Sequence, residues 1–100
     1  MSYYTYIIRC ADGSLYTGIT TNPARRLREH KAGLSGKGAR YTAAHEALGY
    51  ECVFSCPDRS SASRLEWKIK SLKRPEKLRL ISGEDVLGEG DWQRCPLPED

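Results

Sequence analysis

Hydrophobic and polar positions follow two different periods along this chain, and the changes of period mark its predicted elements. Residues 3–10 (YYTYIIRC) and 15–20 (LYTGIT) are rich in aromatic and β-branched side chains, which is typical of strands. The residues between them, ADGS, favour a turn. We therefore predict an antiparallel β-hairpin at the start of the chain.

A first helix is predicted directly after the hairpin. Asn22 can accept hydrogen bonds from the free backbone N–H groups of a helix start, and Pro23 suits the first helical position. The helix should end near Ala32, because Gly33 follows it. Residues 33–47 are rich in glycine, lysine and alanine, which indicates a connection with at most a short helical turn.

One strand and two further helical segments complete the predicted domain. Residues 50–55 (YECVFS) have the composition of a strand. A second helix is expected from residue 58 or 60 to about residue 73, where Pro75 either starts a third helix ending at Gly83 or kinks the second. This order of elements predicts an α+β fold in which a small three-stranded sheet, antiparallel or mixed, is covered by helices.

The pattern is lost after Gly83. Residues 84–100 contain six acidic side chains and several glycines and prolines, so we expect residues 1–83 to form the domain and 84–100 a poorly ordered acidic tail, anchored at most by Trp92. A disordered tail and a tail that lies over a basic surface are both consistent with this charge.

Size and composition limit the alternatives. A chain of 100 residues and 11.3 kDa fits one domain. No segment approaches the roughly 20 apolar residues of a membrane span, and the first residues do not resemble a signal peptide, so we expect a cytoplasmic protein. No two of the four cysteines have the two-residue spacing of a zinc knuckle, and we interpret them as ordinary thiols.

Positive charge is concentrated in two segments. Residues 21–40 carry six basic and one acidic side chain, and residues 61–80 carry seven basic and two acidic ones. Two such segments suggest an anionic partner, with phosphate as the leading candidate. Solvated helix faces explain the same charge equally well.

Two tyrosines of the hairpin are the first candidates for chemistry. A two-residue loop would place Tyr6 and Tyr16 on opposite faces of the sheet, whereas a three-residue loop with Gly13 in the left-handed conformation would place them on one face. The sequence is compatible with both loops, and the two rings could also be ordinary core or edge aromatics.

The first helix offers a second pair. Arg26 and His30 are four residues apart and therefore project from one face, while Arg25 can pair with Glu29 on another. A guanidinium can grip two phosphate oxygens, and an imidazole can exchange a proton near neutral pH. A basic helix face in solvent is the simpler alternative.

Glu66 lies at the edge of the apolar stripe of the second helix, and Trp67 points away from that stripe. A carboxylate at the margin of a buried face is costly unless it is compensated. Glu66 is therefore either the ion-pair partner of a nearby arginine or a metal ligand, and one carboxylate with water and phosphate suits magnesium.

Together these residues resemble the GIY-YIG nuclease family, in particular its small stand-alone bacterial proteins and, over the first helix, the endonucleases that cut branched DNA. The resemblance covers about residues 3–83. The first motif is matched at Tyr4-Thr5-Tyr6, where the last tyrosine is kept, and the second at Tyr16-Thr17-Gly18, where the tyrosine and the glycine are kept.

The resemblance implies hydrolysis of phosphodiester bonds in DNA with one divalent cation. Glu66 would bind Mg²⁺ or Mn²⁺, and Arg26 would hold the negative charge that develops on phosphorus. Tyr6, Tyr16 and His30 would orient the attacking water and move its proton, with the base among them undecided. Gly18 would allow close approach of the DNA backbone.

We find no separate DNA-recognition domain in this sequence of the kind that larger members attach, so we expect its own basic side chains to contact phosphate. Such contacts are salt-sensitive and read no bases. We therefore expect binding that is guided by DNA structure, such as branched or single-stranded regions, and not by sequence. A non-catalytic nucleic-acid-binding module and a protein-interaction domain are the alternatives. The predicted DNA contacts are Gly18, Arg25, Arg28, Lys37, Arg40, Lys68, Lys70 and Lys73.

Overall fold

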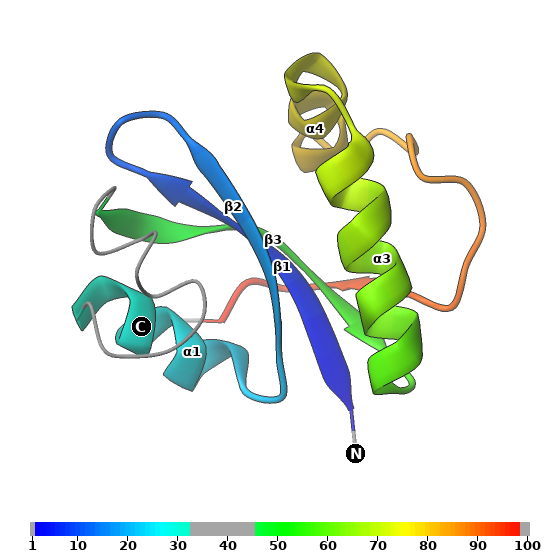
Figure 1. Cartoon of the computed structure of the whole chain (residues 1–100), viewed down its shortest axis with the longest axis horizontal. Coiled ribbons are helices and arrows are strands. Elements are labelled where there is room, and N and C mark those ends of the chain that lie inside the picture. The colour runs from blue at the N-terminus through cyan, green and yellow to red at the C-terminus, as the bar shows by residue number, and fades with distance from the viewer. Residues whose placement is uncertain (1, 33–45, 99–100) are drawn as a thin grey trace.

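The computed structural model describes residues 2–32 and 46–98, and in them four antiparallel strands form one sheet in the order β2-β1-β3-β4 (Figure 1). The prediction of three strands is therefore wrong, while the α+β class is confirmed. The extra strand comes from residues that we had assigned to the tail. The strands are β1 (Tyr3–Cys10), β2 (Leu15–Thr20), β3 (Ala47–Cys56) and β4 (Gln93–Cys95).

The hairpin between β1 and β2 has the three-residue loop. Tyr6 lies opposite Gly18 and Ile8 lies opposite Tyr16. Gly13 has a φ of 86°, which glycine adopts without strain, and the Cys10 N–H donates to the Ser14 carbonyl at 2.9 Å. Since side chains alternate along a strand, this register puts both tyrosines on the same face of the sheet.

The helices begin at the predicted caps. Asn22 Oδ1 accepts from the Arg25 N–H at 3.0 Å, and Asp58 accepts from the Ser61 N–H at 2.7 Å, which fixes the earlier of the two expected helix starts. Pro75 belongs to a separate helix and does not kink the one before it. The described helices are α1 (Pro23–Ala32), α3 (Arg59–Ser71) and α4 (Arg74–Ile81).

The sheet is covered by α1 on one face and by α3 on the other (Figure 1). Alternation along β1 sends Ile7 toward α3 and Ile8 toward α1. The α3 face has a core of Ile7, Cys52, Phe54, Cys56, Ala62, Leu65, Ile69 and Leu80. The α1 face has a core of Tyr6, Ile8, Cys10, Leu27, Ala47, Tyr50 and Val53.

The segment after α4 packs on the domain. β4 pairs with β3, and Val86, Leu87 and Trp92 pack against the α3-face core. The Arg94 guanidinium donates to two carbonyl oxygens at the end of α4, each at 2.8 Å. We had expected residues 84–100 to form a poorly ordered tail, and in the structure apolar side chains and one edge pairing connect residues 84–98 with the domain.

Within residues 2–32 and 46–98, no helix has the length and apolar character needed to cross a bilayer. The four cysteines are free thiols, and all but the half-buried Cys95 are buried. Lys37, Arg40 and the expected connection up to residue 45 lie outside the described residues.

Candidate active site

The two hairpin tyrosines form the floor of the site. Tyr6 is 1% exposed and Tyr16 is half-buried, and their ring centroids are 6.4 Å apart. His30 from α1 lies beside both, with ring centroids 5.8 Å from Tyr6 and 5.5 Å from Tyr16. The hairpin and α1 therefore bring these three predicted catalytic side chains together.

Gly18 is required by these phenols. A Cβ at this position would lie 2.5 Å from the Tyr6 hydroxyl oxygen and 3.1 Å from Cε2 of Tyr16. Contacts near 2.5 Å are not tolerated, so a side chain here would displace the Tyr6 ring. The space that a side chain would take here is filled by Tyr6, and the expectation that the missing side chain makes room for DNA stays a prediction.

His30 is a buried, neutral imidazole. Its Nε2 lies 2.9 Å from the Tyr6 hydroxyl, and only 1% of the residue is exposed. Burial, with a smaller contribution from the positive charge of Arg26, lowers the pKa of His30 to about 4. A neutral ring has one nitrogen that can accept a hydrogen bond, so His30 Nε2 can accept a hydrogen bond from the Tyr6 hydroxyl.

Tyr6 is also neutral at ordinary pH. Burial raises the pKa of Tyr6 to about 12, although a hydrogen bond with Arg26 and the charge of Arg26 oppose this increase. Burial and the nearby Glu66 carboxylate also raise the pKa of Tyr16. Neither phenol is a ready base by itself, and each depends on the charges around it.

Arg26 connects the phenols to α1. Its side chain is 16% exposed, and Nη1 donates to Glu29 Oε1 at 3.1 Å. The predicted pair of Arg25 with Glu29 also forms, at 3.9 Å, so Glu29 serves two arginines. Glu29 and Tyr6 together hold the Arg26 guanidinium in position.

Glu66 projects from α3 toward the same place. Its side chain is 26% exposed, and Oε2 lies 3.4 Å from Nζ of Lys70 one turn later. We had expected either an ion pair with an arginine or a metal ligand. The ion pair that forms is with lysine, and such a part-exposed pair within one helix contributes only a few tenths of a kcal/mol.

A cleft of about 390 Å³ joins these groups. Residues from the α1 face and from α3 both line it, and β2 is the edge strand, so the cleft lies where the two faces of the sheet meet. His30 lies behind Tyr6 and does not line the cleft. The lining residues are Tyr6, Tyr16, Gly18, Ile19, Arg26, Arg59, Glu66 and Lys70.

Arg59 was missed by the sequence analysis. It is the first residue of α3, and seven residues, or about two turns, separate it from Glu66. Arg59, Glu66 and Lys70 therefore share one side of the helix, a spacing that the sequence already contained. With Arg26, the cleft has three cationic side chains around one carboxylate.

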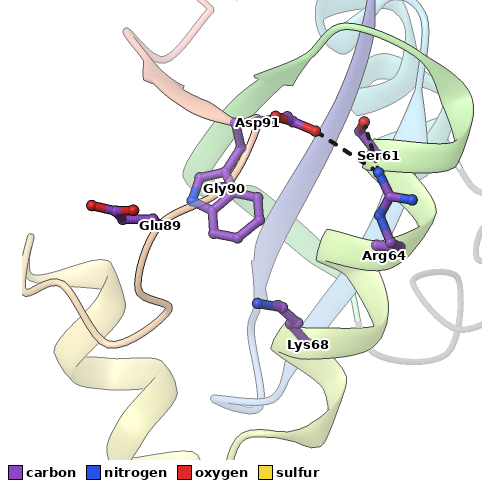
Figure 2. A pocket seen from close by; sticks show the side chains of 7 residues that line it. Ser61, Arg64, Lys68, Glu89, Gly90 and Asp91 are labelled. Carbon is purple, nitrogen blue, oxygen red and sulfur yellow. Dashed lines mark hydrogen bonds and ion pairs between the residues drawn. The ribbon is translucent and has the colours of Figure 1, made fainter.

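The other predicted DNA contacts lie elsewhere on the surface. Lys68 Nζ is 5.1 Å from the centroid of the Trp92 ring, in a hollow that it shares with Arg64 (Figure 2). The backbone N–H of Lys73 donates to Glu76 at the start of α4. Arg25 and Arg28 are exposed on α1. Of the described residues in that predicted set, only Gly18 and Lys70 line the cleft.

The donor set fits one hard divalent cation. Among the described residues there is no group of three or more His, Cys, Asp or Glu side chains that could hold a metal without help. Magnesium is commonly bound by one or two carboxylates together with water and substrate phosphate. Glu66, in a cleft with cations suited to phosphate, meets that description.

Comparisons with known proteins show the family of this chain. Residues 2–79 match the family model described as the GIY-YIG catalytic domain. A UPF0213 protein of Fusobacterium nucleatum is 45% identical over 85 residues, which are 85% of this chain and 82% of that protein. A UPF0213 protein of Desulfotalea psychrophila is 45% identical over 84 residues, covering 84% of this chain and 74% of that protein.

A solved structure shares the fold. The solution NMR structure of a UPF0213 protein from Bacillus halodurans matches with a TM-score of 0.52 and 39% sequence identity, covering 82% of this chain and 84% of that one. The family match includes every element that lines the cleft.

Proposed function

Because the chain belongs to the GIY-YIG catalytic domain family, we propose that it is a divalent-metal-dependent endonuclease that hydrolyses phosphodiester bonds in DNA. One observation carries the proposal. Tyr6, Tyr16, Arg26 and Glu66, which come from two strands and two helices on both faces of the sheet, line a single cleft. Folding alone does not require four such side chains to converge.

The charges of the cleft suit a phosphodiester. Arg26, Arg59 and Lys70 attract phosphate, whereas the Glu66 carboxylate alone repels it. Glu66 would hold Mg²⁺ or Mn²⁺, and the chemistry supplied there is neutralisation of the phosphate and of the leaving oxygen. Arg26, held by Glu29 and Tyr6, is placed to stabilise the negative charge that develops on phosphorus.

Proton movement is assigned to the phenols, with His30 as the residue that positions Tyr6. Tyr16 is the more exposed phenol and orients the attacking water at the cleft. Burial and, to a smaller extent, Glu66 raise the pKa of Tyr16, so a cation held by Glu66 would oppose the second of these two effects. The neutral imidazole of His30, at 2.9 Å, can accept a hydrogen bond from the Tyr6 hydroxyl and so fixes the direction of that O–H group.

Recognition in this proposal depends on the shape of the DNA. The polar groups of the cleft are phosphate binders, and phosphate contacts carry no sequence information. Binding should therefore weaken steeply as salt is added.

Cleavage assays test the proposal. The substrates are duplex, single-stranded, flap and branched DNA with Mg²⁺ or Mn²⁺, and the variants are Glu66→Gln and Arg26→Ala. We expect each variant to lose at least about 100-fold in cleavage rate while keeping its circular dichroism spectrum. Glu51→Gln is the matched control, because Glu51 pairs with Arg9 at 3.5 Å and does not line the cleft.

Two results would contradict the proposal. Cleavage by Glu66→Gln at the wild-type rate would exclude the metal-binding role. Tight binding of DNA without cleavage of any substrate would instead indicate a non-catalytic nucleic-acid-binding module.

A further inference from the structure

Trp67 is the large hydrophobic side chain that the described part of the fold exposes most. It is 70% exposed, whereas the next such residue, Leu97, is 49% exposed. Its neighbours on α3, Leu65 and Ile69, are fully buried, so the helix is anchored without it. Exposing an indole to water has a free-energy cost, and folding gives no reason for one at this position.

The surroundings of Trp67 are basic and hollowed. A shallow pocket of about 400 Å³ is lined by Trp67, Arg64, Lys68 and the small side chains of Ser60 and Ser63. On the other side, Trp67 and Lys68 border a second hollow of about 230 Å³ next to Val86 and Leu87. The ring therefore stands between two hollows, with cations beside it.

The interactions that these cations make within the protein are weak. Figure 2 shows Arg64 near Asp91, with an ion pair of 3.8 Å between two side chains that are about two thirds exposed. Such exposed pairs contribute little and are easily exchanged for another anion. Arg64 and Lys68 can therefore contact the phosphates of a nucleic-acid strand that passes this part of α3.

Trp67 directly follows the cleft residue Glu66 on α3. At 3.6 residues per turn, Trp67 lies about 100° around α3 from Glu66, and Lys70 lies between them at about 40°. A strand whose phosphate occupies the cleft and which continues past Lys70 would bring its next base to the indole.

We propose that Trp67 is a stacking platform for an unpaired nucleobase beside the scissile phosphate, and that it selects single-stranded DNA. This inference rests on the proposed nuclease function. Aromatic rings beside cations are the usual means of holding single strands, because every base has a face that can stack. The bases of a duplex are already stacked on their neighbours, so this ring adds no affinity for duplex DNA.

A binding assay without divalent metal tests the platform. The affinity of wild type and of Trp67→Leu is measured by fluorescence anisotropy for a labelled 12-mer of dT and for a hairpin duplex. We expect Trp67→Leu to bind the dT strand about 5- to 150-fold more weakly and the duplex within about twofold of wild type. Trp67→Phe should keep part of the affinity, because it retains an aromatic face.

Leu78→Ala is the control, since Leu78 is a 46% exposed hydrophobic residue on α4, and its removal should change neither affinity. A second measurement uses Trp92→Phe, which leaves Trp67 as the one indole of the chain. Its fluorescence should be quenched saturably by the dT strand. Equal binding of the dT strand by wild type and Trp67→Leu would overturn the proposal, as would equal loss of both DNAs.

The two proposals fail separately. A loss of single-strand affinity in Trp67→Leu together with unchanged cleavage by Glu66→Gln would leave the platform and remove the metal-dependent nuclease. Loss of cleavage in Glu66→Gln with unaltered DNA binding by Trp67→Leu would support the metal-dependent nuclease and remove the stacking platform. In that case the exposed indole would have to meet a protein partner instead.

Discussion

The two faces of the sheet are built from different side chains. The α3 face has a dry core in which Leu65 and Ile69 pack on Ile7 and Phe54. The α1 face is built around the phenols of Tyr6 and Tyr50 and the imidazole of His30. The core of the first face is mostly apolar, although the buried Thr5 hydroxyl donates there to the Ala62 carbonyl at 2.9 Å, whereas the core of the second face contains three polar rings that need partners.

The polar rings of the α1 face find their hydrogen-bond partners within the domain. The Tyr6 hydroxyl contacts His30 Nε2 at 2.9 Å, and the Tyr50 hydroxyl donates to the Pro23 carbonyl at 2.7 Å. Across the part of the chain that the structure describes, no buried side-chain nitrogen or oxygen lacks a hydrogen-bond partner. The comparison teaches that the α3 face supplies stability, while the α1 face holds reactive groups in fixed positions.

The largest stability effect is expected on the dry face. Leu65→Ala should lower the free energy of unfolding by about 2 to 5 kcal/mol, because it leaves a cavity at a fully buried position. Urea titration followed by circular dichroism measures this change. Leu48→Ala is the control, since Leu48 is 44% exposed, and its effect should stay below about 0.5 kcal/mol. Equal effects of the two substitutions would show that the α3 face is not the stabilising one.

A smaller loss of stability with a large loss of activity is expected at Gly18. Gly18→Ala places a methyl group against the Tyr6 hydroxyl and should cost about 1 to 3 kcal/mol. Moving that phenol should also slow cleavage at least about tenfold, as measured on the best DNA substrate.

Gly49→Ala is the matched substitution for Gly18→Ala. It also lies in a strand, and a Cβ there would meet nothing within 4 Å. It should leave both stability and cleavage close to wild type. If Gly18→Ala behaved like Gly49→Ala, the Tyr6 position would not matter for the site.

The smallest effect is a pH dependence carried by His30. The pKa of His30 is about 4 in the folded protein against an ordinary 6.5, so between these values only the unfolded chain takes up the proton. Stability contributed by this group is therefore complete above pH 6.5 and is lost as the pH falls toward 4, by up to about 2 kcal/mol between pH 7 and 5.

Unfolding measured at pH 7, 6 and 5 checks this expectation. The slope should flatten in His30→Gln, because acidic side chains titrate mostly below this range. An unchanged slope in that variant would place the titration on another group.

The sequence analysis predicted the hairpin, the capped helices and six of the residues that line the cleft, and missed Ile19 and Arg59. Asn22, Pro23 and Asp58 indicate helix starts, because capping depends on residues that are close together in the sequence. Arg59 could have been found from its spacing to Glu66 on one helix. The fourth strand could not, because Gln93–Cys95 is too short for a period and its partner Val53–Ser55 is some forty residues away.

The sequence by itself determined which side chains share an element and a face, since periods of 2 and 3.6 are set by backbone geometry. Tertiary structure alone decided three matters: the hairpin loop, the docking of residues 84–98 and the meeting of Glu66 with Tyr6 and Tyr16 across the β2 edge. Each depends on contacts between distant segments, whose free energies no local pattern contains.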